Sequence, residues 1–241
     1  MKIHTFASQE ETAIGLIEKI IDLVSNHKEN KFHIAFSGGS TPKLMFDLWV
    51  SEYKDKTPWN KLCVYLVDER CVPPDDVDSN YGMMKSHLLD AVSIPADQIH
   101  RIRGEDDPDT EAKRYSKLVY GQLPKSEEGY PQFDLVILGA GDDGHTSSIF
   151  PGQEELLKSS ELYLPSINPE TKQKRIALTG EPIINAFQVY FLITGANKAT
   201  VVADIFESND NGPAAYIAHF SKSTEIFIDE EASTELDRTH E

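Results

Sequence analysis

The chain has 241 residues, of which 39% are hydrophobic and 26% charged, and its formal net charge is −17. No apolar run approaches the roughly 20 residues that span a bilayer, and no cluster of Lys and Arg offers a surface for phosphate backbones, so we expect neither a membrane nor a nucleic-acid partner. The opening MKIHTFASQEE has no secretory signal, and Cys63 and Cys71 lack C-x-x-C spacing, which favours a cytoplasmic protein.

The expected elements alternate between helices and short apolar strands. A capping box at Ser8 and Glu11 precedes apolar residues at helical spacing, which predicts an amphipathic helix as the first element. Residues 68–80 are expected to be a polar loop, and the acidic tail from Asp229 to be frayed or a solvated last turn. Strands are expected at 32–37, 62–67, 99–102, 133–138, 175–179, 189–194 and 225–228, and helices at 42–53, from about Asn80, at 108–122 and at 196–207.

This alternation predicts an α/β fold with a doubly wound, mainly parallel sheet and helices on both faces. No repeat or linker divides the chain, so residues 1–241 are expected to form a single domain. In folds of this kind ligands bind outside the carboxyl ends of the strands. The residues that follow each strand are therefore the candidates for a functional site.

The first such strand end is SGGSTP, residues 37–42. Gly38 and Gly39 let the backbone approach a ligand, and Ser40 and Thr41 lead into the next helix, with Thr41 placed to cap it. Free N–H groups there predict a phosphate cradle, although the spacing and the lysine of a nucleotide-binding phosphate loop are missing. The alternative is an ordinary tight turn between a strand and a helix.

Three charged residues, Asp68, Glu69 and Arg70, follow the apolar run 62–67. Core packing does not explain why three charged residues follow a buried strand at its carboxyl end. We therefore expect these residues to line a site. Arg70 is suited to meet an anion, and an acid is suited to orient a sugar hydroxyl or a catalytic group. The alternative is a salt bridge in a solvated loop.

The stretch GAGDDGHTSSIFPG, residues 139–152, meets the G-x-G-x-x-G spacing of a dinucleotide-binding turn. Pro151 and Gly152 interrupt too early for the long helix of that motif, and no strand ending in an acidic residue follows about 20 residues on, which disfavours a dinucleotide. What remains is a histidine on a glycine-rich strand end. His145 is placed to act as a general base, and Asp143 is placed to orient it.

Two cations, Arg175 and Lys198, stand beside later strand ends in an otherwise acidic chain. They are candidates to close a phosphate site, although lone surface cations usually carry no function. The other seven histidines have no metal-ligand spacing such as H-E-x-x-H, so no metal site is predicted. The chain has no G-x-S-x-G elbow, which disfavours a serine hydrolase.

The motifs SGGSTPKLMFDL, VDERCVPPDDVDSNYGMM and LGAGDDGHTSSIFPG, in this order, closely resemble the 6-phosphogluconolactonase family, and RIALT, INAFQVYFLITGANKA and GPAA extend the resemblance over nearly the whole chain. The resemblance implies a carboxylic ester hydrolase with a Rossmann-like fold. It implies conversion of 6-phospho-D-glucono-1,5-lactone to 6-phospho-D-gluconate, in the oxidative pentose phosphate pathway and without a cofactor. The partner is then a small sugar-phosphate lactone, and we expect a monomer or a small homo-oligomer.

The candidate residues fit this reaction. We expect His145 to take a proton from water and Asp143 to orient its ring, while loop N–H groups or Arg70 stabilise the oxyanion and Asp68 supports the site. The 6-phosphate is expected on a second set of groups. This set comprises the backbone of Gly38, Gly39, Ser40 and Thr41, with Arg175 and Lys198.

Two alternatives stay open. Glucosamine-6-phosphate deaminases share the glycine loop but carry a glutamate five residues after the motif histidine, where this chain has Phe150, which counts against that activity. A non-catalytic sugar-phosphate sensor has no use for His145 as a base. The chain also departs from its family at Phe227, where a tryptophan is common, and at 213–215, where PAA replaces the common PAS.

Overall fold

The computed structural model describes residues 1–127 and 129–236, and nine strands of this part of the chain form two sheets. The strands are β1 (Lys2–Phe6), β2 (Phe32–Phe36), β3 (Leu62–Leu66), β4 (Asp68–Arg70), β5 (Leu135–Leu138), β6 (Tyr163–Ile167), β7 (Lys174–Leu178), β8 (Gln188–Ile193) and β9 (Thr224–Asp229). The α-helices are α1 (Gln9–Asn26), α2 (Ser40–Tyr53), α3 (Asn80–His87), α4 (Pro108–Gln122), α5 (Glu154–Leu157), α6 (Gly180–Ile184), α7 (Ala199–Glu207) and α8 (Pro213–Phe220).

The larger sheet has six strands in the order β1-β9-β8-β5-β2-β3, all parallel, which confirms the predicted α/β fold. The chain leaves β2 for β3 on one side, whereas after β5 it returns to the sheet as β8 on the other side. This reversal of strand order between β2 and β5 opens a crevice above their carboxyl ends, because the two connections diverge. The loops after these strands therefore border the same crevice.

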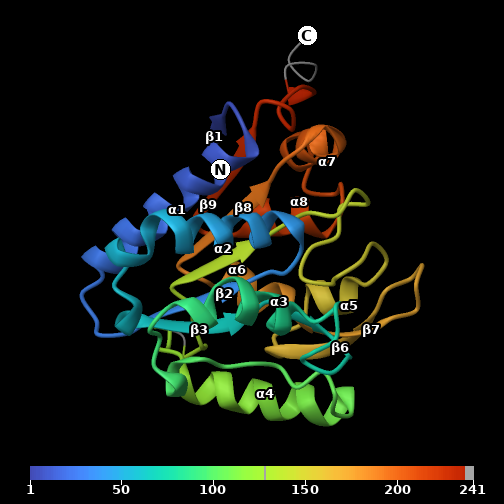
Figure 1. Ribbon diagram of the computed structural model, residues 1–241. Coiled ribbons are helices and arrows are strands. Elements are labelled where there is room, and N and C mark those ends of the chain that lie inside the picture. The colour runs from blue at the N-terminus through green and yellow to red at the C-terminus, as the bar shows by residue number, and fades with distance from the viewer. Residues whose placement is uncertain (128, 237–241) are drawn as a thin grey trace.

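Helices cover both faces of this sheet, so its central strands are buried apolar runs. In Figure 1, α1 and α2 cross in front of the sheet and the dimmer α8 lies behind it. Helix α1 begins as its sequence predicts, with the Ser8 hydroxyl accepting from the Glu11 N–H at 3.2 Å. Its apolar stripe, including Leu16 and Ile17, is fully buried against the sheet.

The first element is a strand and not the predicted helix. Strand β1 pairs in parallel with β9 at the edge of the sheet, where Ile3 is 39% exposed. Five residues with only two apolar members give a weak local pattern. The strand exists because β9, more than 200 residues along the chain, supplies its hydrogen-bonding partner.

The predicted strand at 99–102 is wrong. Ile99 makes one isolated bridge to Val64, and the His100 N–H donates to the Val64 carbonyl at 2.9 Å. This contact covers the outer edge of β3 but does not extend into a ladder. Ile102 is buried nonetheless, so its apolar character reflects packing and not strand pairing.

A second sheet, which the sequence did not predict, has the antiparallel order β4-β7-β6. Residues 68–80 were expected to be a loop throughout, yet Asp68–Arg70 forms β4; the predicted strand at 175–179 is β7 and belongs to this small sheet. Val67 joins the two sheets, because its N–H donates to Phe36 of β2 and its carbonyl accepts from Leu178 of β7. The register places Arg70 opposite Arg175.

The tail is ordered at its start. The Asp229 carboxylate accepts hydrogen bonds from the N–H groups of Gly195 (3.0 Å) and Ala232 (2.9 Å), and Ala232 is fully buried. Of the two alternatives for the tail, fraying is therefore wrong for residues 229–236, whereas the expected turn is present after β9; residues 237–241 lie outside the described part of the chain. Among the described residues, no helix combines the length and apolar character needed to cross a bilayer.

A polar cluster is buried at the amino ends of the central strands. His33 of β2 is 6% exposed, its Nδ1 lies 3.0 Å from the Tyr65 hydroxyl, and its N–H donates to Asp134 at 2.7 Å. His100 stacks on Tyr65 with ring centres 4.7 Å apart. Burial lowers the pKa of His33 to about 4, because desolvation disfavours the imidazolium ion.

We predict that the free energy of unfolding falls by about 2 kcal/mol more in the wild type than in His33→Phe when the pH drops from about 7.5 to about 5. The sign follows from proton uptake. Unfolded His33 titrates near 6.5 and folded His33 near 4, so in this window only the unfolded state gains a proton. Urea denaturation at both pH values measures the difference. An equal pH dependence in the two proteins contradicts the assignment.

Candidate functional site

A cleft of about 300 Å³ lies above the carboxyl ends of β2, β3 and β5, at the reversal of strand order. Four predicted site residues are not in the lining of this cleft: Gly39, Ser40 and Thr41 begin α2, and Asp143 contacts the His145 ring. The structure thus gathers side chains from five segments of the chain at one site. Of the residues predicted from the sequence, the cleft brings together Gly38, Asp68, Arg70, His145, Arg175 and Lys198.

The loop after β2 depends on glycine at two positions. Gly39 has a φ of 112°, in the region that favours glycine, and a Cβ on Gly38 would overlap the Asn80 amide at 1.9 Å. Within the described residues, the N–H groups of positions 38–41 donate to no other group. Thr41 does not cap α2 as predicted: the N-cap is Gly39, and the Thr41 hydroxyl lies 3.4 Å from that of Thr194. The free N–H groups at the start of a 14-residue helix suit an anion.

The loop after β5 folds back on itself and presents His145 to the cleft. The Gly141 N–H donates to the His145 carbonyl at 2.8 Å, and the Gly144 N–H donates to the Gly141 carbonyl at 3.0 Å. The imidazole lies flat against Gly141, since a Cβ there would meet His145 Nδ1 at 2.1 Å. Glycine is therefore required at position 141 because the His145 ring packs against it. In a dinucleotide-binding turn, by contrast, a glycine lets the ligand come close to the backbone.

His145 and Asp143 form a pair. The His145 Nδ1–H donates to Asp143 Oδ1 at 2.5 Å, and the His145 backbone N–H donates to the same oxygen at 3.1 Å. Partial burial opposes ionisation of Asp143, but these His145 contacts outweigh it and lower the pKa of Asp143. Nε2 of His145 has no partner among the described residues, and the ring packs against Phe150 with centres 4.6 Å apart. A neutral imidazole held in this way presents the Nε2 lone pair, so it can accept a proton.

Asp68 and Glu69 both organise the cleft wall. Asp68 Oδ2 accepts from the Ser148 hydroxyl at 2.5 Å, and the Asp68 carbonyl accepts from the Asn80 amide at 2.9 Å. Glu69 is buried and accepts from the N–H groups at the start of α3, including that of Tyr81 at 2.8 Å. Burial raises the pKa of Glu69 in spite of these donors. The two carboxylates thus fix the loop that follows β4.

Arg70 and Arg175 are directly opposite each other in the small sheet. Like charges in this position are unfavourable, and burial together with the nearby Arg70 lowers the pKa of Arg175. One Asp68 carboxylate oxygen lies 4.0 Å from Arg175. The Nε atoms of both arginines are buried and have no hydrogen-bond partner among the described residues. Two guanidinium groups that line one cleft are suited to a dianion.

Lys198 also reaches the cleft, where its ammonium group has partners from the loop after β5. It donates to the Ala140 carbonyl at 2.9 Å and to Asp142 at 2.5 Å. Its side chain is 23% exposed and that of Asp142 is 66% exposed. Lys198 therefore links the loop after β8 to the loop that carries His145.

The cleft residues that sequence reasoning missed include Asn80, Ser147, Ser148 and Asn168. None carries a charge, and Asn168 comes from the turn between β6 and β7, a hairpin that was not predicted. Ser147 and Ser148 lie inside the motif that was quoted for His145. Their position in that motif was the one available signal.

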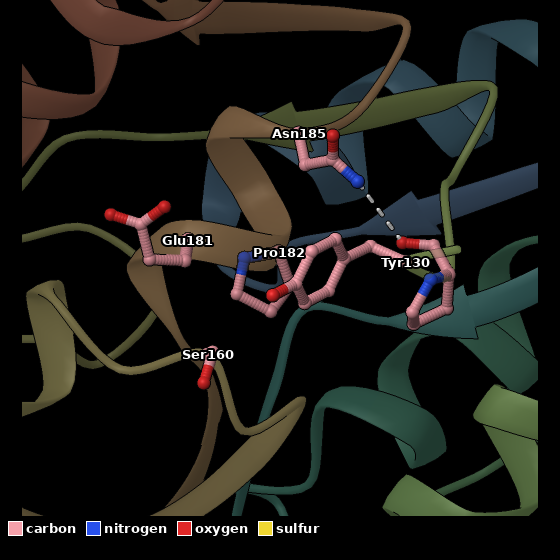
Figure 2. Close-up of a pocket in the computed structure, with 6 residues that line it drawn as sticks. Tyr130, Ser160, Glu181, Pro182 and Asn185 are labelled. Atoms are coloured by element: carbon pink, nitrogen blue, oxygen red, sulfur yellow. Dashed lines mark hydrogen bonds between the residues drawn. The ribbon is translucent and has the colours of Figure 1, made fainter. Parts of the chain in front are cut away.

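A different hollow lies near the amino ends of β5 and β8, away from this cleft. In Figure 2 the Glu181 carboxylate points away from the Tyr130 ring, and the Asn185 amide donates to the Pro131 carbonyl at 3.4 Å. This hollow has no cation and no histidine in its lining. Elsewhere in residues 1–127 and 129–236, no three His, Cys, Asp or Glu side chains are grouped as metal ligands.

Comparisons with known proteins find relatives that match most of this chain. The model of the family described as glucosamine-6-phosphate isomerases/6-phosphogluconolactonase matches residues 7–226. A 6-phosphogluconolactonase of Treponema pallidum is 38% identical over 85% of this chain and 84% of its own length. One of Haemophilus influenzae is 37% identical over 92% of this chain and 95% of its own length. The structure of a 6-phosphogluconolactonase from Trypanosoma cruzi superposes with a TM-score of 0.86 at 29% identity, over 98% of this chain and 96% of its own.

We predict that Gly141→Ala displaces the His145 ring, because the new methyl group overlaps Nδ1 and the Asp143 carboxylate. In ¹H–¹⁵N NMR we expect the wild type to show a downfield proton resonance for the His145 Nδ1–H, and we expect this resonance to shift or vanish in Gly141→Ala. Gly139→Ala is the matched control, since a Cβ there has its nearest neighbour at 4.0 Å. An unchanged resonance in Gly141→Ala, or the same loss in both variants, refutes the predicted packing.

Proposed function

The chain belongs to the family of glucosamine-6-phosphate isomerases and 6-phosphogluconolactonases, and on that premise we propose that it hydrolyses 6-phospho-D-glucono-1,5-lactone to 6-phospho-D-gluconate. This reaction belongs to the oxidative pentose phosphate pathway. The observation that carries the proposal is that one cleft is lined both by His145, which Asp143 orients, and by the two arginines Arg70 and Arg175. A sugar lactone with a phosphate at its far end matches both groups.

His145 acts as the general base. Its Nε2 takes a proton from water, the hydroxide oxygen adds to C1 of the lactone, and the electron pair of the carbonyl bond moves to the carbonyl oxygen. When the tetrahedral intermediate collapses, the bond from C1 to the ring oxygen breaks and the ring oxygen takes the proton from Nε2. Asp143, whose lowered pKa keeps it ionised, stabilises the imidazolium between these steps.

The 6-phosphate is held at the other end of the cleft. We assign it to Arg175 and Lys198 together with the free N–H groups of residues 38–41, and Arg70 adds a second guanidinium opposite Arg175. Lys198 keeps one of its three donors for this purpose, since Ala140 and Asp142 occupy two. Anchoring the phosphate places C1 of the lactone near His145.

Asp68 acts through its neighbours. Its carboxylate holds the Ser148 hydroxyl and lies near Arg175, so it orients both walls of the cleft. The deaminase alternative finds no support here, because Phe150, packed on the His145 ring, leaves no carboxylate at the position that the deaminases use. The sensor alternative does not explain why Asp143 orients the His145 ring, because a protein that only binds a sugar phosphate needs no general base.

We predict that His145→Ala lowers acid release from freshly generated 6-phosphogluconolactone by roughly 10²- to 10⁴-fold, the usual range for a general base. Release is followed in weak buffer with the spontaneous rate subtracted. His87→Ala is the matched control, because His87 Nδ1 pairs with Asp47 at 2.7 Å on the surface, outside the cleft. No acceleration by the wild type refutes the proposed function, and ammonia release from glucosamine 6-phosphate supports the deaminase instead.

We predict that Arg175→Gln raises KM for the phosphorylated lactone by about tenfold or more, with little change in kcat, since one charge-assisted contact to phosphate is lost. The rate with unphosphorylated glucono-1,5-lactone is expected to stay the same. Arg101→Gln, which breaks the surface pair with Glu105, serves as the control. A loss of kcat on both lactones argues that Arg175 acts on the reacting carbonyl and not on the phosphate.

A further inference from the structure

Residues 146–149 form a tight two-residue turn directly after His145. The Thr146 N–H donates to the Ile149 carbonyl at 3.3 Å, and the Ile149 N–H donates to the Thr146 carbonyl at 2.7 Å. The two central residues, Ser147 and Ser148, have φ values of 52° and 54°. A turn of this shape normally uses glycine or asparagine, because a Cβ is strained in the left-handed region. Among the other described non-glycine residues, only Lys172 has a positive φ.

The surroundings hold this strained turn in place. The Ser147 hydroxyl donates to the Leu178 carbonyl at 2.6 Å, and the Ser148 hydroxyl donates to Asp68 at 2.5 Å. The Ser166 hydroxyl in turn donates to the Ser148 carbonyl at 2.6 Å. Ser147 and Ser148 are only 5% and 4% exposed, yet both line the cleft. Their side chains therefore face the protein and leave the backbone of the turn for the cleft.

The N–H groups of Ser147 and Ser148 donate to no group in the described part of the chain. Both residues line the cleft, so these N–H groups are available to a ligand atom there. Consecutive left-handed residues aim their N–H groups in the same direction, as the first turn of a helix does. Two parallel donors beside the general base fit a single oxygen atom close to the reacting carbon.

We propose that the N–H groups of Ser147 and Ser148 form the oxyanion hole of the lactonase reaction. They donate to the carbonyl oxygen of the lactone as water adds to C1, and they hold the negative charge of that oxygen until the bond to the ring oxygen breaks. This assignment rests on the proposed function. Backbone donors fixed before the reaction need no rearrangement when the charge develops, and this accounts for a strained turn so close to His145.

The test removes a single N–H group without changing a side chain. Replacing Ser148 by its α-hydroxy analogue turns the peptide amide between positions 147 and 148 into an ester. This site is favourable, because the Ser147 carbonyl that the exchange weakens accepts no hydrogen bond among the described residues. We expect kcat for 6-phosphogluconolactone to fall about 100-fold, the size found for one oxyanion donor, with KM changed less than about threefold.

Two controls make the result specific. The same exchange at Ser93, an exposed residue whose N–H has no partner in the described part of the chain, is expected to leave kcat and KM unchanged. Ser148→Gly keeps the N–H, accepts the positive φ and removes the hydroxyl, so it measures the contribution of the hydroxyl alone, and its kcat is expected to fall clearly less than that of the ester.

Three outcomes overturn the proposal. Full kcat in the Ser148 ester shows that this N–H has no part in the reaction. A rise in KM without a fall in kcat shows that the turn holds the phosphate. An equally large loss of kcat in Ser148→Gly assigns the effect to the link between the hydroxyl and Asp68. If the wild type itself does not accelerate hydrolysis, the proposed function fails, and the oxyanion hole fails with it.

Discussion

The reversal of strand order between β2 and β5 is the constraint on which the rest of the site depends. Neighbouring parallel strands place their carboxyl ends at one edge, and connections that diverge leave a crevice there which side chains do not fill. The loop after β2 supplies free N–H groups, and the loop after β5 supplies His145. Had both connections run to the same side, a helix packed across the strand ends would separate these two loops.

Close backbone contacts keep the loops of the crevice in a single arrangement. The His145 ring lies against Gly141, and the Ala214 N–H at the start of α8 donates to the Gly144 carbonyl at 2.9 Å. Lys198 ties the same loop to the next strand end through Ala140. The proposed role of His145 as a general base requires this restraint, since small displacements of a catalytic group lower the reaction rate.

The charge of the chain and the charge of the cleft have opposite signs. The protein carries a net charge of −17, yet Arg70, Arg175 and Lys198 converge on one small volume. At physiological salt, exposed charges are screened beyond about 8 Å, so a local cluster decides what binds in the cleft. The electrostatic cost of placing Arg70 opposite Arg175 is offset when an anion lies between the two side chains. The register of the small sheet, which places these arginines opposite each other, is therefore suited to an anionic ligand.

Much of the molecule follows from local patterns. Apolar runs predicted β2, β3, β5, β8 and β9, and a capping box with helical periodicity predicted α1. The helices expected at 42–53 and 108–122 are α2 and α4, with ends correct to within two residues. The motifs around His145, Asp143 and Arg70 pointed to the residues that the cleft assembles. Such patterns are readable because burial and helix capping act over a few neighbouring residues.

By itself, then, the sequence determined the α/β class and which segments carry polar groups at strand ends. Only the tertiary structure decided that β4 and β7 leave the main sheet, that Arg70 faces Arg175, and that the N–H groups of Ser147 and Ser148 find no partner among the described residues. The physical reason is distance along the chain. Strand pairing and hydrogen-bond satisfaction depend on partners about 100 residues away, and no local pattern records which partner will be chosen.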